Sequence, residues 1–345
     1  MRSKERFIRT IERKPVDRPA CWAGMPDTSA LPGLFTYYGV SDVIGLRRVI
    51  DDDVYPVELP YHSETASAIY AAFDWYKKGA LDTFNRTLTA PGFFADSEDV
   101  SDVDTFDWPD PERYIDVQEI DRRFGEAPDD KAILGVIWSA HFQDTCAAFG
   151  MNNCFMNMID NPELVHAVDD RIVNFYLKAN EIFYRAAKGR LDCILIGNDM
   201  GSQRALMLSP DLIEEFVMPG CRKLVRQAHD FGIKVIYHSC GSIAPIIDKL
   251  IDAGVDAIHP IQAKAAGMSA EELKAGFEGR VSFVGGVDTQ ELLVNGSADE
   301  VAVRVKELRS LFPTGLVVSP SHEAVLGDIP PRNIDAIFKA VKGEM

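Results

Sequence analysis

Short apolar runs alternate with amphipathic stretches of helical length, and this alternation is the feature that most restricts the fold of the chain. After residue 130 the apolar runs cover residues 132–138, 193–197, 234–237, 256–259, 281–284 and 316–318. Each run is apolar on both faces, which is typical of parallel strands covered by helices on both sides. The sequence therefore predicts an α/β fold with a parallel sheet.

A (β/α)8 TIM barrel fits this pattern best, with residues 18–22 and 53–58 as early strands. A doubly wound sheet is the second choice, but no Gly-x-Gly-x-x-Gly follows an early strand and no phosphate-binding Gly-rich loop is present. We expect residues 1–345 to form a single barrel domain. An N-terminal amphipathic helix would extend it and bury Phe7, Ile8 and Ile11.

Helix signals separate the predicted strands. Ser209 and Pro210 predict the start of one helix that continues through Ala228, with Ser209 as N-cap and Pro210 in the first turn. Ser269 and Glu272 have the spacing of a capping box and predict the start of another.

Composition narrows the possible partners and compartment. The 36 Lys and Arg against 53 Asp and Glu give a net charge of −17, which opposes binding to nucleic acid or to an anionic membrane surface. No apolar run reaches the roughly 18 residues of a membrane span, and the charged N-terminus has no apolar signal-peptide core. The 6 cysteines lack paired spacing, as expected of free thiols. We expect a cytoplasmic protein.

Polar residues follow nearly every predicted strand, before the next helix begins. In a barrel the carboxyl ends of all strands meet at one mouth, where enzymes of this architecture build their active sites. The mouth would thus gather three His, one Cys and two Asp, together with amides and hydroxyls. The residues at these strand ends are Trp138, Ser139, Asn198, Asp199, His238, Cys240, His259, Gln262, Asp288 and His322.

His238 and Cys240 give the sharpest local signal. Residues two apart on a strand point to the same side, so the imidazole and the thiolate can converge on one ion. Nitrogen with sulfur suits zinc, and a third ligand from another strand would leave a fourth position open for substrate. His322 is the first candidate for that ligand and His259 the alternative. The remaining histidines, His62, His141, His166 and His229, are not expected to take part.

Carboxylates provide two further candidates. Asp199 follows a polar turn and would face the mouth, as a general base or as the hydrogen-bond partner of a ligand histidine. The acidic run at residues 51–53 could bind a hard cation or place a catalytic carboxylate, but such a run is more often a solvated turn or a helix cap. Gly-x-Ser-x-Gly is absent, so acyl-transfer hydrolysis has no support.

Several longer motifs carry a family resemblance. They are SKERF at 3–7, KPVDRP at 14–19, NDMGSQ at 198–203, HSCGS at 238–242, HPIQ at 259–262, GGVDTQ at 285–290, SPSHE at 319–323 and DIPPRN at 328–333. With these motifs the chain resembles the uroporphyrinogen decarboxylase superfamily over nearly its whole length. Within it, the chain is most similar to the decarboxylase-like branch associated with corrinoid-dependent methyl transfer. The resemblance implies a (β/α)8 barrel, in agreement with the alternation of strands and helices.

Two departures from the family pattern indicate the branch. The decarboxylases follow their first strand with Arg-Gln-Ala-Gly-Arg, whose cations hold the porphyrinogen carboxylates, whereas residues 20–26 here contain no Arg. A polyanionic substrate would therefore leave several charges unpaired. The zinc methyltransferases carry His-x-Cys on one strand and a second Cys near the last strand, where His322 stands here. Imidazole in place of thiolate would leave the zinc site more positive and a stronger Lewis acid.

The resemblance thus implies a zinc-dependent methyltransferase that moves a methyl group between a corrinoid protein and a small thiol, folate or methoxylated substrate. No cobalamin-binding Asp-x-His-x-x-Gly motif is present, so the corrinoid would be carried by a partner protein; a homodimer is a possible assembly. Asp199 would orient a ligand or manage a proton. The expected zinc ligands are His238, Cys240 and His322, and the expected substrate-pocket residues are Trp138, Asn198 and Gln262.

Two other classes of function remain open. One is a metal-free decarboxylase of a small carboxylated substrate, using Asp199 or the acidic run at 51–53. The other is a non-catalytic module that docks a corrinoid protein or senses a small molecule. The polar mouth weighs against the second class, because a scaffold does not need a Cys and a His gathered there.

Overall fold

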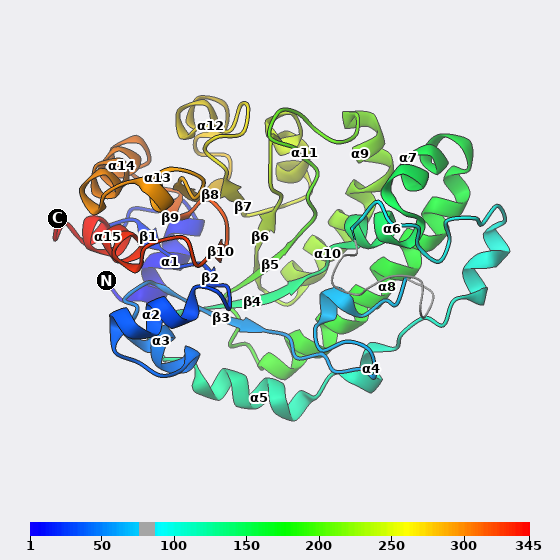
Figure 1. Cartoon of the computed structure of the whole chain (residues 1–345), viewed down its shortest axis with the longest axis horizontal. Coiled ribbons are helices and arrows are strands. Elements are labelled where there is room, and N and C mark those ends of the chain that lie inside the picture. Colours follow the sequence, from blue (N-terminus) through cyan, green and yellow to red (C-terminus); the bar gives the residue numbers. More distant parts are fainter. Residues whose placement is uncertain (76–86) are drawn as a thin grey trace.

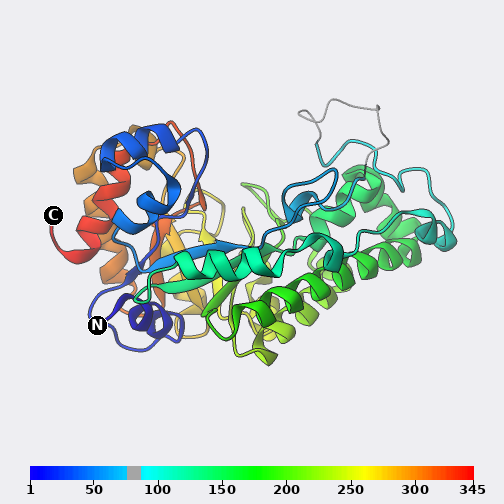
Figure 2. The same ribbon diagram turned by 90° about the horizontal axis from the view of Figure 1, so that it is seen from below.

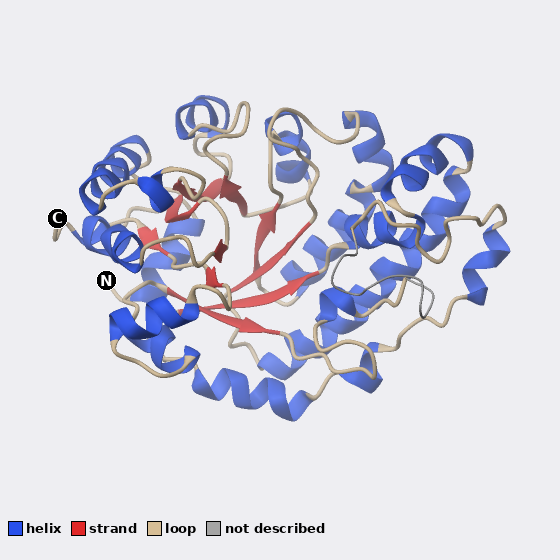
Figure 3. Ribbon diagram, viewed as in Figure 1, coloured by secondary structure: helices blue, strands red, loops and turns tan. Residues whose placement is uncertain are grey.

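A computed structural model describes residues 1–75 and 87–345 of the chain. Eight parallel strands form a nearly closed barrel surrounded by helices (Figures 1 and 3), in the order β1-β9-β8-β7-β6-β5-β4-β3. This confirms the predicted (β/α)8 barrel, and each apolar run corresponds to a barrel strand. The strands are β1 (Ala20–Cys21), β3 (Val54–Glu58), β4 (Ala132–Trp138), β5 (Cys193–Gly197), β6 (Lys234–His238), β7 (Ala257–Ile261), β8 (Ser282–Val287) and β9 (Leu316–Pro320), and β2 (Met25–Pro26) pairs with β10 (Ala324–Val325) in a separate parallel ribbon.

Helices surround this sheet (Figure 3). Three of them, α6, α7 and α8, pack together beside the barrel, and the 26-residue α8 is the longest of the described helices (Figure 2). The helices are α1 (Ser3–Ile11), α2 (Leu31–Tyr38), α3 (Val43–Val49), α4 (Pro111–Tyr114), α5 (Val117–Glu126), α6 (His141–Phe149), α7 (Met151–Asp160), α8 (Pro162–Ala187), α9 (Pro210–Phe216), α10 (Met218–Asp230), α11 (Ile247–Asp252), α12 (Ala270–Phe277), α13 (Leu292–Asn295), α14 (Ala298–Leu311) and α15 (Pro331–Lys342). Short 3-10 turns occur at Ile69–Ala71, Val100–Thr105 and Ala244–Ile246. Within the two described ranges, none of the helices combines the length and apolar character that a membrane crossing requires.

The N-terminal helix α1 closes the amino-terminal end of the barrel. Its Phe7 and Ile11 pack into the same core as the inward-facing side chains of the strands. The Ser282 hydroxyl, at the start of β8, donates to the Ile11 carbonyl at 2.8 Å. Phe7 and Ile11 are buried as predicted, but Ile8 is only half-buried because it lies about 100° around the helix from Phe7. Trp22, directly after β1, belongs to this core, and its strand residues are Ala20, Val54, Ala132, Leu134, Val136, Cys193, Leu195, Ile236, Ala257, Val284 and Val317.

A buried carboxylate joins β1 to β3, where the barrel closes. The Asp53 N–H donates to the Cys21 carbonyl at 2.9 Å, and the Asp53 carboxylate accepts the Cys21 N–H at 2.9 Å. The same carboxylate is fully buried and pairs with Arg6 at 2.7 Å and with Arg18 at 2.8 Å. Because Asp53 directly precedes β3, the acidic run at 51–53 lies at the amino-terminal end of the barrel, away from the mouth.

One helix prediction is wrong in its extent. The long helix predicted after Ser209 is two helices, α9 and α10, which meet at Val217. Pro219 explains the break, because proline has no N–H to donate and its ring clashes with the carbonyl four residues earlier. The predicted N-cap at Ser209 and the capping box of Ser269 and Glu272 are confirmed.

Candidate metal centre

The two-residue period of the strands directs the candidate side chains into the barrel mouth. On β6 the side chain of Ile236 points into the core, so the side chain of His238, two residues later, points to the same side. On β7 the side chains of Ala257 and His259 are related in the same way. Trp138 ends β4 and its ring meets that of His238 edge-on, with the centroids 5.5 Å apart. Strands β4, β6 and β7 thus bring the rings of Trp138, His238 and His259 to one place.

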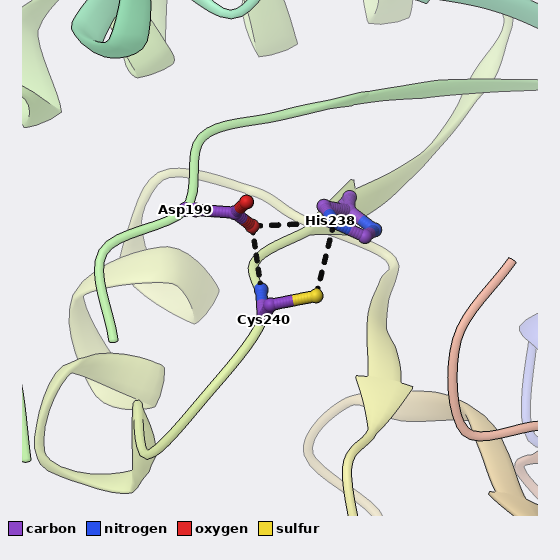
Figure 4. A group of neighbouring side chains, drawn as sticks. All are labelled: Asp199, His238 and Cys240. Carbon is purple, nitrogen blue, oxygen red and sulfur yellow. Dashed lines mark hydrogen bonds and ion pairs between the residues drawn. The ribbon is translucent and has the colours of Figure 1, made fainter. Parts of the chain in front are cut away.

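His238, Cys240 and Asp199 form a compact group at this place (Figure 4). The Nε2 atom of His238 lies 3.5 Å from Sγ of Cys240 and 3.3 Å from Oδ1 of Asp199. The same carboxylate oxygen accepts the N–H of Cys240 at 2.8 Å. Asp199 therefore fixes both the imidazole and the loop that carries the thiol. The donor atoms of the three residues all lie within 4.8 Å of one another.

The loop after β9 adds His322 and Glu323 to the group. The imidazole of His322 lies close to the Cys240 thiol, which raises the pKa of His322, and its ring centroid is 6.2 Å from that of His238. Its Nδ1 accepts the N–H of Ala324 at 3.0 Å, which leaves Nε2 for the thiol or for a metal. The Oε2 atom of Glu323 lies 3.5 Å from Nδ1 of His238, yet it is buried without a hydrogen-bond partner among the described residues.

The pairing of β2 with β10 holds this loop in place. The Met25 N–H donates to the Glu323 carbonyl at 2.6 Å. Gly24, with φ of 74°, passes so close that a Cβ there would lie 2.5 Å from the same carbonyl oxygen. The segment at residues 20–26, which contains no Arg, thus positions the loop that carries His322 and Glu323.

His259 stands behind His238. Their Nδ1 atoms are 2.8 Å apart, and the His259 ring also packs against Trp22 at 5.5 Å between centroids. The Nε2 atom of His259 is buried without a partner among the described residues. Burial and the neighbouring His238 hold the pKa of His259 well below its ordinary value. The donor atoms of His259 group with those of His238 and Glu323, so the residue faces a different side of His238 from Cys240.

Burial and charge act in opposite directions on the pKa values of the group. Burial lowers the pKa of His238, but Glu323 and Asp199 outweigh it and raise that pKa well above its ordinary value. Burial raises the pKa of the Cys240 thiol, but His238 and His322 outweigh it and lower that pKa. For Asp199 the His238 contact likewise prevails over burial and lowers the pKa to about 2. Cys240 is therefore biased toward the thiolate, the form in which cysteine binds metals.

The donor set fits Zn²⁺. Imidazole nitrogen and thiolate sulfur are its preferred ligands. A ligand histidine usually has its other ring nitrogen held by a hydrogen bond, as Nδ1 of His238 is held by His259. Buried polar atoms are normally paired, so the unpartnered Glu323 oxygen also indicates a missing cation or donor. His322 contacts Cys240 but lies outside the 4.8 Å group of Asp199, His238 and Cys240.

Two cavities border this group. The larger, of about 790 Å³, is bordered by Trp138, Asp199, His238, His322 and Glu323 among others. The smaller, of about 230 Å³, is bordered by Gln262 and His322 among others. His322 therefore stands where the two cavities meet.

The three predicted substrate residues have different surroundings. Trp138 borders the larger cavity and has a positive φ of 68°, a strained conformation that often occurs at functional sites. Gln262 borders the smaller cavity, and its Oε1 accepts the Gly241 N–H at 2.6 Å. Asn198 is buried and borders neither cavity; its side chain accepts the Phe142 N–H and donates to Tyr237. Their roles in substrate binding stay predictions.

Sequence reasoning missed several polar residues of the larger cavity, among them Glu323, Gln143 and Asp144. Glu323 directly follows the candidate ligand His322 at a strand end, and that position was an available signal. Gln143 and Asp144 lie in the first turn of α6 and also border the cavity. Nothing in the pattern of that helix distinguishes them from ordinary helical residues.

Comparisons with known proteins agree with the barrel. The family model described as uroporphyrinogen decarboxylase (URO-D) matches residues 88–344. No curated protein matches the chain. A solved methyltransferase from Methanosarcina mazei has a TM-score of 0.72 at 18% sequence identity, covering 100% of this chain and 99% of that one. A proposed vitamin-B12-independent methionine synthase from Listeria monocytogenes has a TM-score of 0.49 at 11% identity, covering 95% of this chain and 99% of that one. At these identities we take the first similarity as evidence of fold, and we base nothing on the second.

Proposed function

The chain belongs to the uroporphyrinogen decarboxylase family, and we propose that it is a zinc-dependent methyltransferase of that family. It would move a methyl group between a corrinoid carried by a partner protein and a small thiol, folate or methoxylated substrate. The observation that carries this proposal is the group of His238, Cys240 and Asp199 at the mouth, with His322 in contact with the thiol. The similarity in fold to a methyltransferase supports it.

The residues of the mouth divide into ligands and residues that orient them. His238 through Nε2, Cys240 through Sγ and His322 through Nε2 would hold the ion. Bound zinc would supply a Lewis acid that lowers the pKa of a thiol acceptor or stabilises the oxygen leaving group of a methyl ether. With Nε2 on the ion, His238 carries its proton on Nδ1 and donates it to Nδ1 of His259. Asp199, with a pKa of about 2, stays ionised at neutral pH and acts by orienting Cys240 and His238.

Carboxylates next to the ligands modify the charge expected from the sequence. One thiolate and two neutral imidazoles would leave a site charge of +1 with Zn²⁺. Glu323 is buried beside His238 and His322, 3.5 Å from a ring nitrogen of each, and brings a compensating negative charge. The zinc site would then bind an anionic thiolate or alkoxide less strongly than a site of charge +1 would. It would also release such a product more readily.

A metal-free decarboxylase is the second candidate, and the family match favours it. Two observations weigh against it. The acidic run at 51–53 lies at the amino-terminal end of the barrel, and Asp53 there is fully used in pairs with Arg6 and Arg18. Residues 20–26, which would hold substrate carboxylates, contain no Arg. Of the predicted carboxylates, only Asp199 faces the mouth.

The test is methyl transfer by the purified full chain, followed by the visible spectrum of the corrinoid. Zinc-loaded protein is mixed with methylcobalamin and a panel of thiols or tetrahydrofolate, and in the reverse direction with cob(I)alamin and methoxylated compounds. We expect turnover in one direction and its loss in Cys240→Ala. Release of CO2 from a carboxylated compound by zinc-free protein, with no methyl transfer, would favour the decarboxylase instead.

A further inference from the structure

The larger cavity at the mouth has an aromatic wall in addition to the candidate zinc ligands that border it. Its volume of about 790 Å³ is in the range of small-molecule sites. Tyr70, Phe73, Trp75 and Trp138 border it, from segments far apart in the chain. Phe73 and Trp75 are buried and stack on each other with centroids 4.8 Å apart. Such a wall suits a ring-sized apolar ligand.

Two of the hydrogen-bond acceptors that border this cavity lie in the first turn of α6. Asp144 is 8% exposed, and its carboxylate accepts the Tyr176 hydroxyl at 2.5 Å and the Trp75 indole N–H at 3.5 Å. A carboxylate offers about four acceptor positions, so capacity for another donor remains. The Oε1 atom of Gln143 is buried without a hydrogen-bond partner among the described residues. A buried acceptor without a donor costs free energy, and a ligand that brings a donor removes that cost.

We propose that Asp144, assisted by Gln143, is the residue that selects the small-molecule substrate, and that this substrate is an aromatic methyl ether with a free hydroxyl group. The inference rests on the proposed function, because it names the partner of methyl transfer that the cavity holds. The aromatic wall receives the ring, and the hydroxyl donates to the Asp144 carboxylate. The methoxy group is then free to face the side of the cavity that His238 and His322 border.

The test is calorimetric binding of two matched probes to the full chain without any corrinoid. The probes are 2-methoxyphenol, which has a hydroxyl donor, and 1,2-dimethoxybenzene, which has the same ring and no donor. At pH 8, where the Asp144 carboxylate is ionised, we expect wild-type protein to prefer 2-methoxyphenol by about tenfold, the effect of one hydrogen bond to a charged acceptor. Asp144→Asn, which keeps the shape of the side chain, should reduce this preference about fivefold, while the exposed Asp129→Asn control should leave it unchanged.

The outcomes separate this inference from the proposed function. Equal affinity for the two probes, no binding of either probe, or a preference that survives in Asp144→Asn would overturn it. If Asp144→Asn does not fold, Gln143→Leu provides the same test, with a reduced preference expected. Intact preference without any methyl transfer would overturn the proposed function alone. Zinc-dependent methyl transfer with no probe preference would overturn the substrate assignment alone.

Discussion

Nδ1 of His259 lies 2.8 Å from Nδ1 of His238, on the side of the His238 ring away from Cys240. This contact leaves a single nitrogen of His238 directed at the thiol. It also fixes the plane of the ring, so that Nε2 points where a shared ion would lie. His238 is therefore a candidate ligand whose ring is held in place by His259. His259 can be substituted without changing any of the candidate ligands.

Substituting His259 should weaken zinc binding without abolishing it. His259→Leu keeps much of the volume but cannot accept the His238 proton, so we expect zinc affinity to fall about 10–100-fold. Competition with a chromophoric chelator measures this directly. Loss as complete as in Cys240→Ala would make His259 a ligand itself, and an unchanged affinity would contradict its orienting role.

Because Gly24 lies so close to Glu323, a substitution at Gly24 should also lower zinc affinity, although Gly24 is not a candidate ligand. Gly24→Ala places a Cβ 2.5 Å from the Glu323 carbonyl and should displace the loop that carries His322, lowering zinc affinity at least tenfold. Gly39→Ala is the matched control, because Gly39 has a similar φ of 68° but open space around it. Both variants should lose about 1 kcal/mol of unfolding free energy from backbone strain. Equal zinc affinity in the two variants would contradict the account.

The acidic run at 51–53 should affect stability and leave the chemistry intact. Asp53→Asn removes a charged partner from two largely buried guanidinium groups, of which Arg6 keeps its pair with Asp17, so we expect the unfolding free energy to fall by about 3 kcal/mol. Asp51→Asn, at an exposed pair with Lys342, should change it by less than about 1 kcal/mol. Urea titration measures both. A stable Asp53→Asn protein that has lost activity would place this carboxylate in catalysis after all.

Asp144 should make stability depend on pH. Burial raises the pKa of its carboxyl from 3.8 to about 7, since the Tyr176 hydrogen bond only partly offsets the cost of burying the charge. Between these values the unfolded chain is ionised while the folded chain holds the proton, so stability falls as pH rises from about 4 to 7 and levels off above. The loss is on the order of 4 kcal/mol.

Asp144→Asn cannot titrate and should lack this contribution. Its unfolding free energy relative to wild type should therefore rise between pH 4 and pH 8, as measured by urea titration at each pH. A difference between the two proteins that is the same at both pH values would contradict the assignment of this titration to Asp144.

The barrel and half of the mouth could be predicted from the sequence because both follow from simple periodicities. Apolar runs give the strands, and Cys240 lies close to His238 because it follows two residues after it, in the loop that begins where β6 ends. The contact between Cys240 and His322, over 80 residues apart, follows from the gathering of strand ends at one mouth.

Other features depend on tertiary packing that no local pattern records. The partnership of His259 with His238 arises from the register of β6 against β7, which pairs the two residues directly. Asp144 reaches the cavity because α6 packs on α8, where Tyr176 meets it. The break at Pro219 was visible in the sequence, but the continuous apolar pattern across it concealed the two helices.

Zinc content is the measurement that tests the central claim most directly. Purified full chain, reconstituted with zinc and dialysed, should contain about one zinc per chain by elemental analysis. Cys240→Ala should contain almost none while keeping its circular dichroism spectrum, and Cys154→Ala, a buried thiol away from the mouth, should keep its zinc. A wild-type protein that retains no zinc, or a Cys240→Ala protein that retains all of it, would contradict the metal centre proposed here.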